Sequence, residues 1–450
     1  MVEYQKRRLI PDREEDLTDS KTFAQFGRSG TGISPLRVVA SLGCDAFNPF
    51  QSKTAHAVVQ STALYMYLLV LPERMRFQKK NMLLLAVLPG EPKQHLINNI
   101  LNRVVNLLLP LEEGLHYLQT AKYPFGRNVS LVVVPIVCDS LGAHQLVGFP
   151  SPTHTLFCTR CLLPKSDISN LDRTSWPRRD PEQHRIRATE WRDAATQKIR
   201  NDIYKKYGVR WSELLRLPGF DPIAFTVIDD LHMCLLGLIE THIRDIWGID
   251  EDAEGGLGQT KARKDYQKPP NSLNLSVDLS SRKVIGRDVL EAAWADMMRT
   301  IHPSWISPAP VHWGLARTGK LGGNEWKIVG TIHLVVTLIR IWGYGEAGER
   351  RRRMLLNFVD LVKATHILLL RVTTPKLREE YDFWILKYLR GVQELFPDVG
   401  FTPNHHYSMH MSEFLESMGP GHSRSTPVFE QTNHVLQMIK KNRHAGKFNS

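Results

Sequence analysis

The sequence predicts an α/β protein in which a strand-rich first part precedes a long, mainly helical region. Short apolar runs of strand length lie before residue 140, whereas amphipathic helical patterns dominate from about 165 to 400. Hydrophobic residues make up 42% of the 450-residue chain, which is enough to bury a large core. We therefore expect two or three structural units.

The first strand is expected at residues 36–42. It follows an arm, residues 1–34, that is rich in charge, Ser and Gly and has no sustained period. The run ends in Gly43-Cys44-Asp45, just before the turn residues Asn48-Pro49. The pattern thus predicts that Asp45 lies at the carboxyl end of a strand.

Three further elements complete the first part. Residues 64–71 and 82–88 are apolar runs stopped by proline and predict strands, and 97–108 repeats apolar residues at helical spacing. The β-branched run 130–138 predicts a central strand, although Pro135 favours an edge or a bulge. This strand delivers Asp139 at its end.

The rest of the chain is predicted to be mainly helical. Amphipathic patterns cover 231–239, 287–300, 325–342 and 347–397, and a loop is expected at about 250–274. A closing helix is expected at 427–441, with Glu430 off its apolar stripe. The expected domains are the arm 1–34, a first core part 35–165, a helical insertion 166–400 and a closing part 401–450.

Charge and cysteine content narrow the class of protein. The excess of 58 Lys and Arg over 46 Asp and Glu recurs in local patches such as Arg350–Arg353, which suits a nucleic-acid partner or, equally, a solvated surface. Five cysteines and the charged N-terminal sequence indicate a reducing compartment. The apolar stretches are too short to span a membrane, so we expect no membrane partner.

A pair of cysteines predicts half of a structural zinc site. Cys158 and Cys161 have the spacing that brings two sulfurs to one side of a knuckle. Because the chain has no second such pair, we expect His405 and His410 to supply the other half. Five-residue spacing does not place two side chains on one helical face, so one of these must lie in a loop or at a helix start. The alternative ligands are His406, His232 with Cys234, and His242.

Several segments, in order along the chain, together resemble the CACTA (Tnp2-like) transposases of fungal genomes. They include Cys44-Asp45-Ala46-Phe47-Asn48-Pro49-Phe50, Leu88-Pro89-Gly90-Glu91-Pro92-Lys93, Val137-Cys138-Asp139, Ser175-Trp176-Pro177-Arg178-Arg179, Phe220-Asp221-Pro222, Asp229-Asp230-Leu231-His232 and Phe429-Glu430 with Asn433. The constellation is also similar to that of the V(D)J recombinase and its Transib relatives. The 19 residues from Asp139 to Cys158 and the 20 from His410 to Glu430 equal the separations in that group.

The resemblance implies an RNase H-like mixed sheet interrupted by a large helical insertion, with structural Zn²⁺ pinning the insertion to the core. It further implies an acidic triad of Asp45, Asp139 and Glu430 that binds two Mg²⁺ or Mn²⁺ ions, since hard cations prefer carboxylate oxygens. Such a DNA transposase cleaves transposon ends and joins them to target DNA. We expect it to bind terminal repeats, self-associate and work in the nucleus.

Two other interpretations stay open. The chain departs from the family at Ala46, where the family has Gly, and at Asp230, where it has Pro; little sequence precedes Asp45 and little follows the closing helix. These features favour a domesticated, catalytically inactive DNA-binding protein. Glu240 is the reserve candidate for the third carboxylate. A zinc-stabilised helical scaffold unrelated to DNA would require the ordered matches to be accidental.

Overall fold

The computed structural model describes residues 12–25, 36–49, 60–90, 94–119, 123–249, 284–344, 348–424 and 427–438. The chain divides into two compact units. The sheet unit comprises residues 1–165, 176–229 and 414–450, and the helical unit comprises 166–175 and 230–413.

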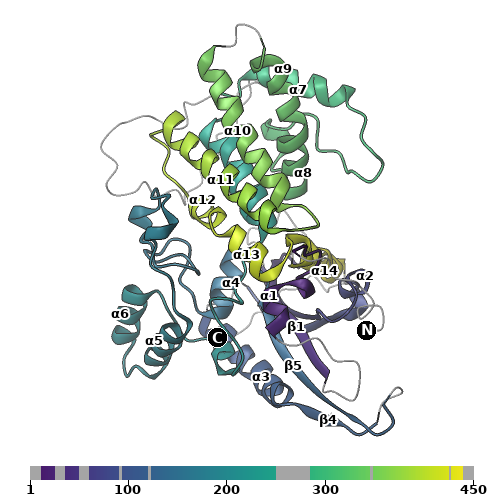
Figure 1. Cartoon of the computed structure of the whole chain (residues 1–450), viewed down its shortest axis with the longest axis vertical. Coiled ribbons are helices and arrows are strands. Elements are labelled where there is room, and N and C mark those ends of the chain that lie inside the picture. Colours follow the sequence, from purple (N-terminus) through teal and green to yellow (C-terminus); the bar gives the residue numbers. More distant parts are fainter. Residues whose placement is uncertain are drawn as a thin grey trace. The chain divides into compact units, whose positions relative to one another are not determined.

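One mixed sheet forms the centre of the sheet unit, which confirms the α/β class (Figure 1). Its strands lie in the order β3-β2-β1-β5-β4. They are β1 (Leu36–Phe47), β2 (Ser61–Leu68), β3 (Met82–Pro89), β4 (Leu115–Tyr117) and β5 (Arg127–Ile136). β2 runs antiparallel to both β1 and β3, β5 runs parallel to β1, and β4 runs antiparallel to β5.

The parallel pair β1–β5 is the core of this sheet. Both strands are mostly buried at their carboxyl halves, as the near-continuous apolar runs predict. The register shifts between Ala40 and Leu42 on β1, where Ser41 donates a hydrogen bond to the carbonyl of Pro135 (2.9 Å). The irregularity expected at Pro135 is therefore present as a bulge, and β5 is flanked by β1 and β4.

Helices pack against the strands of this unit. They are α1 (Lys21–Gln25), α2 (Glu73–Arg76), α3 (Gln94–Glu113), α4 (Ser140–Val147) and α14 (Pro427–Met438). α3 packs on β5 through Ile97, Leu101, Val105 and Leu108, four of the six residues of the predicted stripe. α14 packs on β1, and its Phe429 ring stacks on Tyr65 of the neighbouring strand β2 with centroids 5.4 Å apart.

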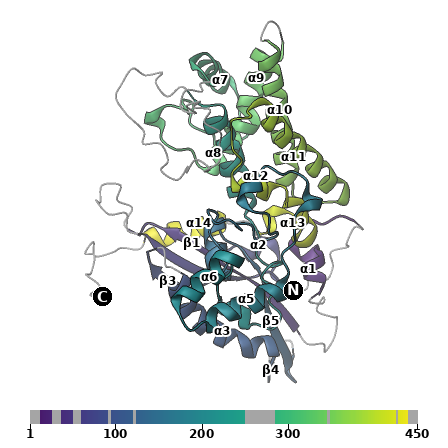
Figure 2. The same cartoon turned by 90° about the vertical axis from the view of Figure 1, so that its left-hand side faces the viewer.

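A helical hairpin, α5 (Pro181–Asp193) and α6 (Gln197–Tyr207), belongs to the sheet unit (Figure 2). Asp180 and Thr196 cap the two helix starts by accepting bonds from Gln183 N and Ile199 N. Gly208 ends α6 in the left-handed conformation (φ 62°), which glycine adopts without strain.

The helical unit is built on long antiparallel helices. α10 (Glu349–Leu368) and α11 (Pro375–Leu395) lie side by side in both views (Figures 1 and 2). The other elements are η7 (His232–Ile239), η8 (His242–Ile246), α7 (Arg287–Arg299), α8 (Gly323–Ile328), η12 (Val329–His333), α9 (Leu334–Trp342), α12 (Pro403–Ser408) and α13 (Met411–Met418), whose second half belongs to the sheet unit. η7, η8 and η12 are π-helical. The buried core of the helical unit includes Trp247, Trp313, Trp326 and Trp342.

The structure differs from the sequence-based expectations in several places. Asp45 lies inside β1 rather than at its end, because β1 continues to Phe47 against β2. Residues 176–229 cluster with the sheet and not with the helical insertion. The loop expected at 250–274 and most of the arm 1–34, which was expected to be flexible, lie outside the described residues. The described part of the arm is folded instead, because α1 buries Phe23 and Asp16 forms a buried ion pair with Arg76 (2.8 Å). None of the helices within the described ranges is both long and apolar enough to cross a membrane.

Candidate functional site

Two predicted carboxylates come from neighbouring parallel strands. Asp45 is in β1, and Asp139 follows β5 after the extended residues Val137 and Cys138. The preceding residues pair directly, because Val137 N donates to the carbonyl of Leu42 (2.9 Å) and Cys44 N lies 3.1 Å from the Cys138 sulfur. The strand pairing therefore brings Asp45 and Asp139 to one edge of the sheet, and both are only partly buried.

Asp45 is held from α14. The side-chain amide of Asn433 donates to Asp45 Oδ2 (2.7 Å), and Asn433 in turn accepts a hydrogen bond from the Tyr65 hydroxyl. Burial first, and then the negative charge of Asp45, raise the pKa of Tyr65 above its ordinary value. Tyr65 consequently remains a donor at all ordinary pH values, and the chain Tyr65–Asn433–Asp45 fixes one carboxylate oxygen.

Asp139 also has a structural role. It is the N-cap of α4, and its Oδ1 accepts a hydrogen bond from Gly142 N (2.6 Å). A Cβ at Gly142 would come 2.8 Å from the Cys44 sulfur and 2.9 Å from Asp139 Oδ1, so glycine is required for this close packing. Asp139 Oδ2 is not used by this cap.

The third predicted carboxylate is on the helix beside Asp45. Glu430 lies in α14, between Phe429 and Asn433, but its side chain is outside the described part of the structure. The reserve candidate, Glu240, lies at the end of η7 in the helical unit.

Asp229 is a further acidic residue near this edge, and the sequence patterns did not predict it there. Residues 225–227 extend the sheet, since Ile136 N donates to Phe225 O (2.8 Å) and Val227 N donates to Ile136 O (3.3 Å). This parallel segment ends at the buried Asp229. The apolar run Val227-Ile228 before Asp229 repeats the pattern at Asp139, but its length of two residues gives too weak a strand signal.

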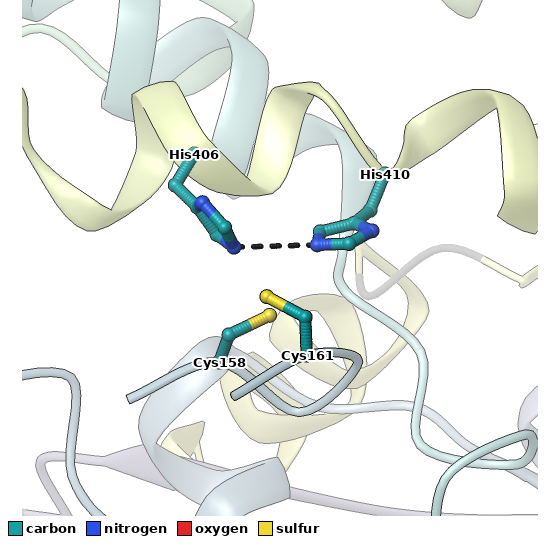
Figure 3. Close-up of side chains that lie close together, drawn as sticks. All are labelled: Cys158, Cys161, His406 and His410. Carbon is teal, nitrogen blue, oxygen red and sulfur yellow. Dashed lines mark hydrogen bonds between the residues drawn. The ribbon is translucent and has the colours of Figure 1, made fainter. Parts of the chain in front are cut away.

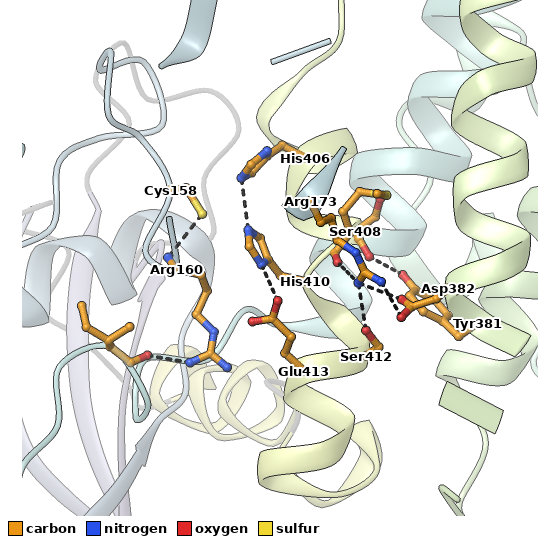
Figure 4. Close-up of polar contacts among 12 residues, drawn as sticks. Cys158, Arg160, Arg173, Tyr381, Asp382, His406, Ser408, His410, Ser412 and Glu413 are labelled. Carbon is orange, nitrogen blue, oxygen red and sulfur yellow. Dashed lines mark hydrogen bonds and ion pairs between the residues drawn. The ribbon is translucent and has the colours of Figure 1, made fainter. Parts of the chain in front are cut away.

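The predicted cysteine pair forms a tight knuckle within the sheet unit. Cys158 and Cys161 are both fully buried, and Arg160 N approaches the Cys158 sulfur at 3.3 Å (Figure 4). Arg179 braces the turn by donating to the carbonyl of Cys158 (2.7 Å). Contact with the Cys158 sulfur and burial raise the pKa of the Cys161 thiol, so the pair keeps its protons unless a cation displaces them.

Two histidines of the helical unit face each other at the end of α12. The Nε2 atoms of His406 and His410 are 3.2 Å apart, and both side chains are buried. The Nδ1 atom of His410 lies 3.2 Å from a Glu413 carboxylate oxygen, the kind of partner that fixes a metal-binding imidazole (Figure 4). Arg173 bonds both Asp382 (2.7 Å) and the carbonyl of Met409 (2.8 Å), which steadies this turn.

The four side chains make a group that can hold a metal ion. One ligand atom each from Cys158, Cys161, His406 and His410 lies within 4.8 Å of all the others. Figure 3 shows both imidazoles and both sulfurs pointing toward one another. Two thiolates and two imidazoles are a donor set typical of tetrahedral zinc.

The predicted ligand His405 was the wrong histidine of the pair His405-His406. Its Nδ1 accepts from Thr402 N (3.1 Å) at the start of α12, and its ring stacks on Phe401 with centroids 4.9 Å apart. Burial lowers the pKa of His405 to about 4, as expected for a neutral core residue. His406 instead joins the group that can hold a metal ion, because its Nε2 lies 3.2 Å from that of His410 in the turn after α12.

The other alternative ligands lie elsewhere in the helical unit. The Cys234 sulfur contacts the Thr365 hydroxyl (3.1 Å), and His242 Nδ1 contacts the Tyr388 hydroxyl (3.1 Å). Neither belongs to the metal-binding group. Comparisons with protein-family models and with curated proteins find no match to this chain.

Proposed function

We propose that this protein is a metal-dependent DNA strand-transfer enzyme of the CACTA transposase type. The observation that carries the proposal is the placement of Asp45 and Asp139 at one edge of a mixed sheet by the parallel strands β1 and β5. The packing of α14 beside Asp45 supports Glu430 as the third carboxylate. The mixed sheet is compatible with the RNase H-like core that the resemblance implies.

The residues present suit divalent cations. Asp45 and Asp139 are partly exposed, so an ion and a phosphate can reach them, and hard oxygen ligands favour Mg²⁺ or Mn²⁺. Two ions at this edge would stabilise the charge that develops on a phosphodiester during in-line displacement. The protein's part is to orient the carboxylates: Asn433 holds Oδ2 of Asp45, and the α4 cap holds Oδ1 of Asp139.

Zinc at the second site would be structural. Cys158, Cys161, His406 and His410 fill a tetrahedral set, which leaves no position for substrate. Bound Zn²⁺ would link the knuckle at residues 158–161 to the end of α12, about 245 residues later in the chain. We propose DNA with terminal repeats and target DNA as partners, self-association on paired ends, and a nuclear location, all on the resemblance.

A second candidate function is sequence-independent or repeat-specific DNA binding without cleavage. It is favoured by the structural roles of both aspartates, because a cap to α4 and a hydrogen bond to α14 explain Asp139 and Asp45 without any metal. In that case these residues stabilise the fold only.

A DNA-nicking assay distinguishes the two functions. The substrate is DNA that carries the source element's terminal repeats, and the assay contains Mg²⁺ or Mn²⁺. Asp139→Asn keeps a cap acceptor but loses the charged metal ligand, so we expect cleavage to fall by at least about 100-fold. Asp180→Asn is the matched control, because Asp180 caps α5 in the same way (2.7 Å). Equal cleavage by wild type and Asp139→Asn, or no cleavage by either with DNA binding kept, contradicts the enzymatic proposal.

A further inference from the structure

The hairpin α5–α6 carries a helix that its own fold covers on one side only. None of the residues of α6 is fully buried, and its half-buried residues, Arg200, Ile203, Tyr204 and Tyr207, recur at helical spacing. The other side, which includes Lys198, Asp202 and Lys205, is exposed. This exposed side is available to a partner.

What the hairpin presents is positive charge. Residues 178–210 contain ten Lys or Arg and five Asp or Glu, a net charge of +5 within 33 residues of a chain whose total is +12. Lys198, Lys205 and Lys206 are exposed on α6, and the first two form no ion pair within the described residues. Lys198 and Lys205 are seven residues apart, so they share one helical face about 10 Å apart along the axis.

The basic side chains are held in place by aromatic rings. Arg187 and Lys206 both lie over the Tyr207 ring, at 4.5 and 5.0 Å from its centroid. Arg200 lies over Trp191 (5.4 Å), and Arg210 lies over Tyr204 (4.8 Å). Stacking leaves the guanidinium edge able to donate hydrogen bonds, and it removes part of the entropy cost of ordering these side chains on a ligand.

The base of the hairpin is fixed to the helix that begins at Asp139. Arg210 N donates to the carbonyl of Gly148 (2.8 Å) at the end of α4, and His184 of α5 packs on Phe149 with centroids 4.7 Å apart. α4 has eight residues and so spans about 12 Å. α4 therefore connects Asp139 at its start to the base of the hairpin at its end.

We propose that α5–α6 is a binding surface for the phosphate backbone of duplex DNA, with Lys198, Lys205 and Lys206 as its principal phosphate contacts. The surface needs DNA as a partner, as the proposed function does, but it does not depend on cleavage at Asp45 and Asp139. An anionic membrane is a poor partner, because Ile199 is the only apolar side chain among the exposed residues of α6, which leaves no apolar face to insert. Regularly spaced phosphates suit a row of lysines better than the irregular charges of an acidic protein.

The affinity of the full chain for DNA tests this surface. It is measured by fluorescence anisotropy of a labelled 30-base-pair DNA, without added Mg²⁺ and at several salt concentrations. The variant Lys198→Ala/Lys205→Ala/Lys206→Ala removes three exposed charges. We expect the slope of log K against log salt to become shallower by about 2 to 3, and affinity to fall at least about tenfold at low salt. Lys80→Ala/Lys320→Ala/Lys376→Ala removes three exposed lysines elsewhere and should keep the slope.

The outcomes separate this inference from the proposed function. Weaker binding and a shallower slope in the α6 variant alone support the surface, whether or not the wild type cleaves DNA. Equal loss in both variants, or none in either, overturns it, even if cleavage depends on Asp139. Displacement of DNA by poly-glutamate at an equal concentration of charge would instead identify an acidic-protein site and also overturn it.

Discussion

At the scale of single residues, the start of α12 decides which histidine can take part in a metal site. His405 accepts a hydrogen bond from Thr402, the residue before α12, whereas His406 faces His410. The spacing of Cys158 and Cys161 made this pair predictable, and both belong to the group that can hold a metal ion. The metal-binding role of the aspartates after apolar runs stays a prediction. Glu413, three residues after His410, is the carboxylate partner of the His410 ring, and no sequence motif predicts this contact.

Zinc content tests this choice of ligand. We expect purified wild type to carry about one Zn²⁺ per chain and His406→Ala to lose most of it, because three ligands bind zinc far more weakly than four. His405→Gln is the matched variant and should keep its zinc, since its side chain can still accept from Thr402. The zinc content is measured by atomic emission. Loss of zinc from His405→Gln, with zinc kept by His406→Ala, would show that His405 is the ligand, as the sequence predicted.

Acid sensitivity should depend in part on His184. Burial first, and then the charges of Arg179 and Arg185, lower the pKa of His184 to about 3. The unfolded chain takes up a proton near the ordinary value of 6.5 while the folded chain does not. This stability is thus present above pH 6.5 and lost as the pH falls from 6.5 to about 3, by up to about 5 kcal/mol.

His184→Leu should therefore flatten the dependence of the free energy of unfolding on pH below 6.5, measured by urea denaturation. His434→Leu replaces an exposed histidine and serves as the control. An unchanged pH dependence in His184→Leu would mean that His184 is charged in the folded protein.

At the scale of elements, strands β1, β2, β3 and β5 and helix α3 follow from apolar patterns that tertiary contacts reinforce. β4 has three exposed residues, too few to give a strand signal, and it pairs with β5. The helical pattern at 347–397 comprises two helices, because Leu369 to Thr374 separates α10 from α11, whose start is capped by Thr374. The hairpin α5–α6 was not predicted, because the stripe of α6 is short and only half-buried.

The contact between β1 and α14 makes an element-scale prediction. A Cβ at Gly43 would lie 2.4 Å from the carbonyl oxygen of Val137 and 2.5 Å from the Phe429 ring. Gly43→Ala should therefore push α14 from the sheet, lower the free energy of unfolding by about 1 to 3 kcal/mol and impair cleavage. Gly323→Ala, at the start of α8, meets only Leu236 Cγ at 3.9 Å and should be neutral. Equal stability of both variants in urea denaturation contradicts this packing.

At the scale of the whole molecule, the division into two units could not be predicted from local patterns. Residues 176–229 contain helices, as the insertion does, yet they pack with the sheet through long-range contacts such as Arg210 with Gly148. The return of 414–438 to β1 is visible in the sequence only through the resemblance. Such returns depend on which surfaces fit, and periodicity carries no information on that.

Zinc removal tests how strongly the second site stabilises the whole chain. We expect a chelator to lower the Tm of the wild type by roughly 5 °C or more in differential scanning fluorimetry, because an ion that binds only the folded state stabilises it. His406→Ala should already have the lower Tm and show little further change. A chelator effect of equal size in both proteins would place the metal elsewhere.

We propose that Asp139 binds a catalytic metal ion, and DNA cleavage by the variant Asp139→Cys in Mg²⁺ and in Mn²⁺ tests this role. A thiolate is a poor ligand for Mg²⁺ and a better one for softer cations. With terminal-repeat DNA, we expect Asp139→Cys to be nearly inactive in Mg²⁺ and to regain part of its cleavage in Mn²⁺, whereas the cap variant Asp180→Cys matches wild type in both. Two results would show that Asp139 is not a ligand of a catalytic metal ion. One is cleavage by Asp139→Cys at the wild-type rate in Mg²⁺, and the other is no rescue by Mn²⁺ in a variant that is folded and binds DNA.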